Sequence, residues 1–330
     1  MEENLYEESN HQEDNEFIRF KRDVSAVRQE IKKMLVGQEQ LVDLMLVSLF
    51  TQGHILLEGV PGLAKTMGAK LFAQALSVDY SRIQFTPDLM PSDVVGTSVF
   101  NMKDSDFIFK AGPVFSNIVL IDEINRAPAK TQSALFEVME ERQVTVDGKT
   151  YTMEYPFMII ATQNPIEQEG TYKLPEAQLD RFLFKIKLNY PNLNDEKLIL
   201  RRFRNDFSQA LMKTVDAVLT AQQIQNANHL VEKIHIKDEI LDYIAEIVHD
   251  TRNNGDLFLG ASPRASLALM KASKAVAAIS GRDFVIPDDV KFVAKPILNH
   301  RIILNADREL EGIETEDVIE EILKKIEVPR

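Results

Sequence analysis

The stretch Gly59-Val60-Pro61-Gly62-Leu63-Ala64-Lys65-Thr66 follows an apolar run at residues 54–58 and precedes a segment with helical spacing at 67–76. This order of strand, glycine-containing loop and helix is the setting of a phosphate-binding loop. Backbone N–H groups of such a loop, together with the positive end of the following helix, surround the phosphates of a nucleotide. Lys65 would add a mobile positive charge, and the Thr66 hydroxyl would be placed to bind Mg²⁺. The stretch therefore predicts a nucleotide-binding site.

One position departs from the usual loop, in which a glycine directly precedes the lysine. Ala64 stands there instead. An alanine methyl is tolerated where the backbone already has helical dihedrals, whereas a position that needs a positive φ disfavours it. The alternative interpretation is a Gly-Pro turn that happens to precede a lysine.

The composition bounds the class of protein. The chain has 330 residues, 45% of them hydrophobic, which is enough for two domains with ordinary cores. A net charge of −13 disfavours general binding to nucleic acid or to an anionic membrane. The absence of cysteine excludes disulfides, thiolate metal sites and a cysteine nucleophile. The six histidines lack companion acids at the spacing of a zinc site, so surface or capping roles are expected for them. No signal-peptide pattern or membrane-length apolar run is evident, so we expect a soluble cytoplasmic protein without a membrane span.

Five short apolar segments alternate with segments of helical spacing. They are residues 54–58, 81–85, 118–122, 157–162 and 183–188. Runs that are apolar throughout and alternate with helices are typical of a parallel sheet covered on both faces. After Pro191 the strand signal fades and the pattern becomes helical. We therefore expect a disordered acidic tail at residues 1–16, an α/β domain at 17–191 and a helical domain at 192–330.

Polar side chains follow two of these expected strands. Asp122 and Glu123 end the segment at 118–122, and Asn164 follows the one at 157–162. In open α/β sheets, ligands bind at the carboxyl ends of the strands. Asp122 is suited to hold Mg²⁺ through water, Glu123 to orient or deprotonate the attacking water, and Asn164 to hold that water or a γ-phosphate oxygen. Taken alone, the two acids are common as a solvated strand end or a helix N-cap, and a turn is the better interpretation of Asn164-Pro165. Together with the loop, these residues predict a nucleotide-hydrolysing site.

Six motifs, in order, resemble the MoxR family of AAA+ ATPases. They are the loop at 59–66, Asp122-Glu123-Ile124-Asn125-Arg126-Ala127-Pro128, Lys130-Thr131-Gln132-Ser133-Ala134-Leu135, Glu141-Arg142-Gln143-Val144, Ala161-Thr162-Gln163-Asn164-Pro165 and Leu174-Pro175-Glu176-Ala177-Gln178-Leu179-Asp180-Arg181-Phe182. The resemblance spans roughly residues 35–301, and the conjunction of motifs is far more specific than any one of them. In this family the alanine before the lysine is usual.

The resemblance implies a fold and a set of ligands. The fold is α/β: an AAA+ αβα nucleotide-binding domain with a five-stranded parallel sheet in the order 5-1-4-3-2, followed by an all-α lid domain. The ligands are ATP or ADP with Mg²⁺, the metal being held at Thr66 and Asp122. The implied nucleotide contacts are Val36, Gly37, Gln38, Gly59, Pro61, Gly62, Leu63, Ala64, Lys65, Thr66, Met67, Asp122 and Arg264.

The family also implies residue roles in catalysis. Lys65 contacts phosphate, Glu123 is the catalytic base, and Asn164 falls on the sensor 1 position. Arg181 matches the arginine finger, which acts on ATP bound by the neighbouring subunit, and Arg264 matches sensor 2. Residues 36–38 align with the segment lining the adenine pocket.

Each arginine has a simpler alternative. Arg181 would form a surface salt bridge with Asp180 or Glu176, and Arg264 would pair with Asp256. Arg126 either faces a subunit interface or caps the following helix.

Two further stretches read as β-hairpins. Residues 144–151 alternate around an Asp147-Gly148 turn, and a looser pair flanks the polar segment 101–106. In the resembling family these are inserts that project toward a ring pore and touch substrate.

The family resemblance finally implies an activity. An ATPase working in a ring, a hexamer by analogy, would drive chaperone-like remodelling or maturation of client protein complexes, with a partner carrying a von Willebrand factor A domain. Two alternatives stay open: a nucleotide-gated assembly platform with incidental hydrolysis, and a motor subunit, either acting on nucleic acid or magnesium-chelatase-like. The acidic balance of the chain disfavours a nucleic-acid motor.

Overall fold

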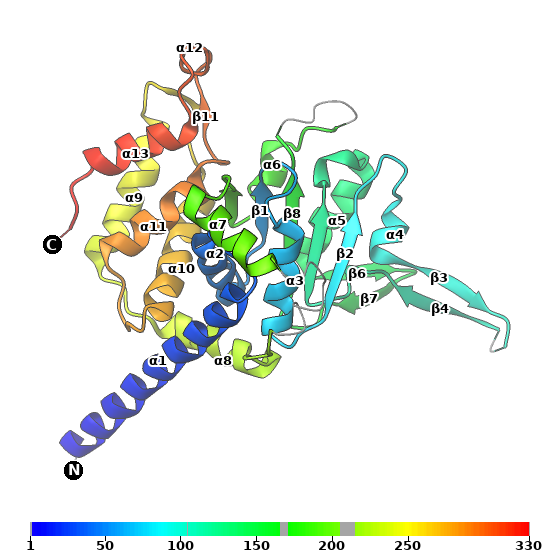
Figure 1. Ribbon diagram of the computed structural model, residues 1–330, viewed down its shortest axis with the longest axis horizontal. Helices are drawn as coiled ribbons and strands as arrows, with labels where there is room; N and C mark the ends of the chain where they lie inside the picture. The colour runs from blue at the N-terminus through cyan, green and yellow to red at the C-terminus, as the bar shows by residue number, and fades with distance from the viewer. Residues whose placement is uncertain (1, 104, 166–170, 205–214, 330) are drawn as a thin grey trace. The chain divides into compact units, whose positions relative to one another are not determined.

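The protein was analysed as a computed structural model, which describes residues 2–103, 105–165, 171–204 and 215–329. The chain forms two compact units (Figure 1). Unit 2 comprises Gln29–Met45 and Gln52–Gln222, and unit 1 comprises Met1–Arg28, Leu46–Thr51 and Gln223–Arg330.

Unit 2 is built on a five-stranded parallel sheet. Its strands are β1 (Ile55–Glu58), β2 (Tyr80–Gln84), β5 (Ile118–Asp122), β8 (Met158–Gln163) and β9 (Phe184–Lys187). They lie in the order β2-β5-β8-β1-β9, and every pairing is parallel. Counted along the chain this is 5-1-4-3-2, so the expected sheet is confirmed. All five residues of β5 are buried, as a strand covered on both faces requires.

Helices precede or follow the strands of the sheet in unit 2. They are α3 (Lys65–Ala75), α4 (Pro91–Val95), the short 3-10 turn η1 (Ile124–Arg126), α5 (Ala129–Glu141), α6 (Glu176–Leu179) and α7 (Leu193–Phe203). Leu135, Phe136 and Met139 of α5 pack in one buried cluster with Leu56, Ile121 and Ile159 of the central strands. Burial of this apolar surface makes the main favourable contribution to the free energy of folding of this sheet.

His54, just before β1, differs from the expected surface role. It is buried, its Nε2 lies 3.1 Å from the Met139 carbonyl, and its Nδ1 accepts a hydrogen bond of 3.0 Å from the Ile159 N–H. A backbone N–H can only donate and a carbonyl can only accept, so Nε2 carries the proton of a neutral ring. Burial lowers the pKa of His54 to about 4. The histidine is therefore a structural link between β1, β8 and the end of α5.

Two antiparallel hairpins extend from unit 2, as expected. One consists of β3 (Gly96–Asn101) and β4 (Asp106–Ala111), the other of β6 (Gln143–Val146) and β7 (Lys149–Thr152). In the second, Asp147 and Gly148 both have positive φ, the signature of a type I′ turn. The β3–β4 hairpin projects away from the sheet in Figure 1.

Unit 1 is mostly helical. It contains α8 (Ala221–Lys233) from Gln223 onward, α9 (Asp238–Arg252), α10 (Pro263–Ile279), α11 (Pro287–Leu298), α12 (Ala306–Leu310) and α13 (Thr315–Lys325). The helical lid is confirmed with one addition, a short antiparallel pair of β10 (Leu257–Leu259) and β11 (Ile303–Leu304). These segments pair because each otherwise leaves backbone groups between helices unsatisfied.

Two N-terminal helices contribute to both units: α1 (Glu2–Lys32) and α2 (Glu39–Phe50). Helix α1 includes the acidic segment for which the composition predicts disorder. Glutamate and glutamine are good helix formers, and the segment continues directly into an apolar helical face that is buried at Phe17 and Phe20. The domain limits at residues 16 and 191 stay predictions.

Candidate nucleotide-binding site

The loop between β1 and α3 has the backbone of an anion cradle. Gly62 and Ala64 have positive φ values of 90° and 57°, while Leu63 between them does not. Such alternation turns successive N–H groups to one side, and the N–H groups of the first turn of α3 add to them. A Cβ placed on Gly62 would meet no heavy atom within 4 Å, so this side of the loop is open.

The backbone at Ala64 differs from the helical conformation in which the sequence analysis expects an alanine to be tolerated. It adopts the left-handed conformation, with φ 57° and ψ 22°, and not the helical dihedrals under which alanine is tolerated. A left-handed residue other than glycine costs about 1–2 kcal/mol. Strain of this kind persists where the surrounding structure determines the conformation, and it clusters at ligand sites.

Lys65, the first residue of α3, folds back over the loop. Its Nζ donates a hydrogen bond of 2.7 Å to the carbonyl oxygen of Gly59. Gly59 itself is packed tightly, because a Cβ there would lie 3.1 Å from Leu63 and 3.2 Å from Leu188. The ammonium is therefore already positioned beside the loop that it is predicted to serve.

Asp122, at the end of β5, is held on both carboxylate oxygens. It is only 7% exposed. Its Oδ2 accepts a hydrogen bond of 2.6 Å from Arg82 Nε, and its Oδ1 one of 3.2 Å from the Thr162 hydroxyl. The same Thr162 oxygen accepts a hydrogen bond of 3.0 Å from the Glu123 N–H. Strands β2, β5 and β8 thus converge on one carboxylate.

Glu123 is a second strained residue, with φ 58° and ψ 53°. Its Oε2 lies 2.8 Å from Arg126 Nε in an ion pair and accepts a hydrogen bond of 3.0 Å from Gln84 Nε2. Arg126, for which an interface or a capping role is expected, thus pairs with the acid three residues before it. Two left-handed residues, Ala64 and Glu123, therefore stand at the carboxyl edge of one sheet.

Asn164 follows β8, which lies between β5 and β1 in the sheet. It is buried, and the Gly59 N–H donates to the Gln163 carbonyl just before it at 3.3 Å. The structure therefore brings Lys65, Asp122 and Asn164 to the same edge, because each follows the carboxyl end of one of three adjacent strands.

The segment 36–38 lies against the start of α7, a contact that was not predicted from the sequence. Gly37 has φ 72°, and a Cβ there would be 2.7 Å from Asp195 Oδ2 at the start of α7. Asn192 caps this helix by accepting from the Asp195 N–H at 3.0 Å. In the sequence, only the pattern Asn192-x-x-Asp195 draws attention to this helix start. That pattern predicts an N-cap, and it does not predict the contact between Asp195 and Gly37.

Arg181 lies between α6 and β9. Its Nη1 donates to the Phe136 carbonyl at 2.7 Å and lies 3.5 Å from Glu140 Oε2, so the structure pairs it with α5 and not with the expected Asp180 or Glu176. Arg264 is the second residue of α10 in unit 1. Asp256, its expected partner, accepts a hydrogen bond of 2.7 Å from Arg308 Nε. The sensor 2 role of Arg264 stays a prediction.

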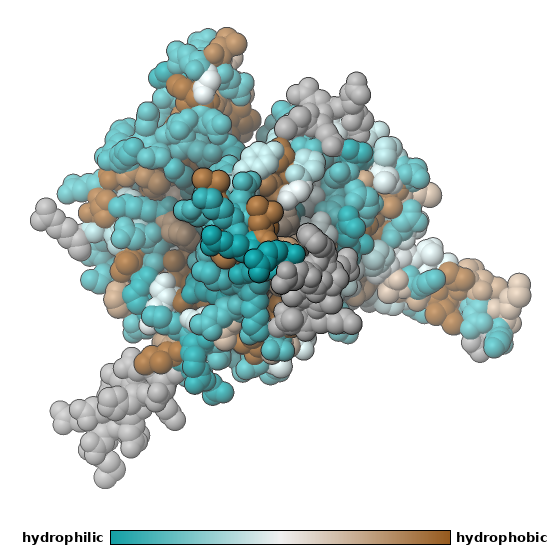
Figure 2. All heavy atoms as spheres, viewed as in Figure 1, coloured by the Kyte–Doolittle hydropathy of each residue, from teal (hydrophilic) through white to brown (hydrophobic). Residues whose placement is uncertain are grey.

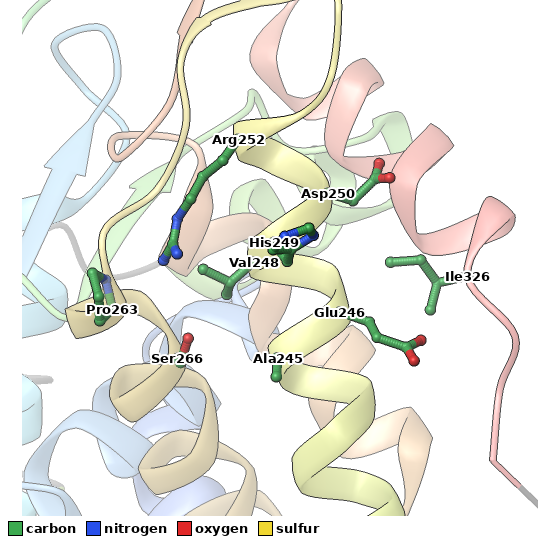
Figure 3. A pocket seen from close by; sticks show the side chains of 9 residues that line it. All are labelled: Ala245, Glu246, Val248, His249, Asp250, Arg252, Pro263, Ser266 and Ile326. Atoms are coloured by element: carbon green, nitrogen blue, oxygen red, sulfur yellow. The ribbon is translucent and has the colours of Figure 1, made fainter.

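Unit 1 also contains a groove (Figure 3). It is lined by Ala245, Glu246, Val248, His249, Asp250 and Arg252 of α9, by Pro263 and Ser266 of α10, and by Ile326. None of the residues predicted from the sequence for the nucleotide site lines it.

Comparisons with known proteins identify the family. Residues 54–184 match the family described as "ATPase family associated with various cellular activities (AAA)", and residues 249–322 match "AAA lid domain". The chain is 46% identical over 301 residues to the uncharacterized protein YeaC of Bacillus subtilis, covering 91% of this chain and 93% of that protein. It is also 46% identical over 312 residues to the chaperone MoxR1 of Mycobacterium tuberculosis, covering 91% and 81%.

The chain belongs to the MoxR family of AAA+ ATPases. A crystal structure described as that of a "putative ATPase" from Cytophaga hutchinsonii is similar to this MoxR-family chain with a TM-score of 0.89 and 42% identity, covering 99% of this chain and all of the other. Membership implies nucleotide binding, with Mg²⁺ as the usual companion, and ATPase activity at the level of the family. In the described part of the chain, no helix has the length and apolarity needed to cross a membrane.

The side chains present fit a magnesium nucleotide. Mg²⁺ prefers oxygen ligands, and the Asp122 carboxylate keeps further lone pairs because each oxygen accepts only one hydrogen bond among those the structure gives. The open loop at Gly62 and the ammonium of Lys65 suit the phosphates.

Proposed function

We propose that this MoxR-family chain hydrolyses ATP with Mg²⁺ in a ring of identical subunits, a hexamer by family analogy, and uses the cycle to remodel or mature client protein complexes. The observation that carries the proposal is the position of Asp122 and Glu123. Asp122 ends β5, and Glu123 follows it directly. Only β8 lies between β5 and β1, the strand that leads into the loop of Gly62 and Lys65, so the acids and the anion cradle share one edge of the sheet.

In the proposed mechanism each side chain has one task. The loop N–H groups and Lys65 bind the phosphates, and Asp122 and Thr66 hold the metal, which supplies positive charge at the phosphate oxygens. Glu123 orients the attacking water and accepts its proton, for which the carboxylate must leave its ion pair with Arg126. Asn164 holds the water or a γ-phosphate oxygen through its amide.

The family resemblance at Arg181 is what supports a shared active site. It lies after α6 and contacts α5 of its own subunit. By family resemblance this guanidinium reaches the ATP of the next subunit, where it would meet the charge that develops on the transferred phosphoryl group. Arginine fingers contribute about 10³–10⁵ in rate, so a lone subunit should be nearly inactive.

The client-binding part of the proposal rests on the β3–β4 hairpin. Its large apolar side chains are exposed: Val99, Phe100, Met102, Phe107 and Ile108 are 49–87% accessible. In Figure 2, hydrophobic residues gather on this hairpin. Exposed apolar clusters of this kind mark interaction sites. The name of the relative MoxR1, a chaperone, supports client proteins as partners. By family resemblance, the proposal also includes a partner protein that carries a von Willebrand factor A domain, and a cytoplasmic location.

Subunit mixing tests the shared site. Arg181→Ala and Glu123→Gln subunits should each be nearly inactive alone, but a mixture should recover part of the activity, because an intact Arg181 then faces an intact Glu123 across some interfaces. The assay is Mg²⁺-dependent phosphate release, whose specific activity in the wild type should rise with protein concentration. No recovery on mixing, together with a flat specific activity on dilution, would refute the shared site.

A second experiment separates a motor from a nucleotide-gated platform. Glu123→Gln should bind ATP and retain client, because hydrolysis no longer resets the ring. If the variant releases client as fast as the wild type does, turnover is incidental and the platform is the correct description.

A further inference from the structure

Strand β2 presents two side chains to the acid pair. Arg82 and Gln84 are two residues apart, so they stand on the same face of the strand. In the parallel register, Gln84 lies opposite Asp122. The edge strand of the sheet thus places a cation and an amide beside the residues proposed to hold the metal and to activate water.

These groups form one hydrogen-bonded chain. Arg82 Nε donates to Asp122 Oδ2 at 2.6 Å, Arg82 Nη2 donates to Gln84 Oε1 at 3.3 Å, and Gln84 Nε2 donates to Glu123 Oε2 at 3.0 Å. Because the amide oxygen of Gln84 faces the guanidinium, its nitrogen must face Glu123. Arg82 therefore decides which end of the amide the catalytic base meets.

The contact with Asp122 is the stronger end of this chain. The aspartate side chain is 9% exposed and the arginine 51%. The Arg82 guanidinium is a permanent cation, so its 2.6 Å hydrogen bond to Asp122 Oδ2 joins two charged groups. A hydrogen bond between two charged groups is roughly twice as strong as a neutral one, and only a planar fork can serve two acceptors in fixed directions.

We propose that Arg82 is a positioning residue that couples the metal site to the catalytic base. The inference rests on the proposed function and names how its site is regulated. Arg82 and Thr162 fix the two oxygens of Asp122, which orients the remaining lone pairs for Mg²⁺. Through Gln84, the same guanidinium acts on the Glu123 carboxylate alongside the ion pair with Arg126, so a shift of Asp122 at the metal changes the hold on the base.

A binding experiment on the full chain tests the first half. A fluorescent ADP analogue is titrated in EDTA and then with Mg²⁺, which separates nucleotide affinity from metal affinity. Arg82→Ala should raise the half-saturating Mg²⁺ concentration about 10- to 100-fold, as loss of a residue that orients a metal ligand does, with nucleotide affinity in EDTA unchanged. The exposed Arg19→Ala is the matched control and should behave as wild type.

Turnover tests the second half. Arg82→Lys keeps a charge near Asp122 but not the fork, so it should recover most of the Mg²⁺ affinity while kcat stays low. Gln84→Ala should lower kcat alone. The double variant Arg82→Ala with Gln84→Ala should lose no more kcat than Arg82→Ala, because both act along one chain.

The outcomes are distinguishable. If Mg²⁺ does not change nucleotide binding by the wild type, the proposed function is wrong. If the wild type responds to Mg²⁺ and Arg82→Ala responds equally or more strongly, only the role of Arg82 is refuted. Should Arg82→Ala fail to fold, as a lowered thermal midpoint would show, Arg82→Lys decides: low kcat with retained Mg²⁺ affinity supports the coupling, and wild-type kcat refutes it.

Discussion

Lowering the pH from 7.5 to 5.5 should destabilise the α/β unit through His54. The neutral ring is buried between the Met139 carbonyl and the Ile159 N–H, which leaves no acceptor for a second ring proton at Nδ1. Desolvation lowers its pKa from 6.5 to about 4. The unfolded chain therefore takes up the proton first as the pH falls.

The sign and size follow from proton linkage. Stability from this group is fully present above the unfolded pKa of 6.5, is lost as the pH falls and is exhausted below about 4. The full loss is about 3.4 kcal/mol, and the part lost between pH 7.5 and 5.5 is about 1.4 kcal/mol.

Urea unfolding followed by circular dichroism measures this loss. Carboxylates titrate too, so the comparison is with His54→Gln, whose amide keeps one donor and one acceptor but does not ionise near neutral pH. The wild type should lose about 1.4 kcal/mol more than His54→Gln over this pH range. His229→Gln, at a side chain that is 67% exposed, is the control and should retain the wild-type pH dependence. Equal pH dependence of wild type and His54→Gln would refute the assignment of a buried neutral ring.

Three substitutions test other features. Ala64→Gly should raise the free energy of unfolding by up to about 1 kcal/mol, because glycine removes the left-handed strain, and a decrease in a urea titration would contradict this. Gly37→Ala should cost more stability than Gly148→Ala, since both have positive φ but only the first new methyl meets a side chain, at 2.7 Å; equal urea midpoints would count against this contact. Replacing Phe100 and Phe107, whose ring centroids are 5.3 Å apart, by serine should weaken client binding while Mg²⁺-dependent phosphate release by the protein alone stays at the wild-type rate, and unchanged client capture would exclude this hairpin.

Local patterns in the sequence were sufficient to predict the parallel sheet. Each strand is a short apolar run, and such runs are typical of strands that are buried on both faces of a parallel sheet. The loop at 59–66 and the acids after β5 were equally readable, since their chemistry depends on neighbours along the chain. The order of the strands came from the family resemblance, and the structure confirms it.

Contacts between residues distant in sequence were decided only by the tertiary structure. Arg82 meets Asp122 forty residues away because β2 lies next to β5, and Arg181 meets α5 rather than its own neighbours. The left-handed backbone at Ala64 and the burial of His54 likewise depend on what surrounds them. Spacing along a chain reports the period of a helix or strand, whereas the pairing of charges and the dihedrals of a packed loop depend on the free energy of the whole fold.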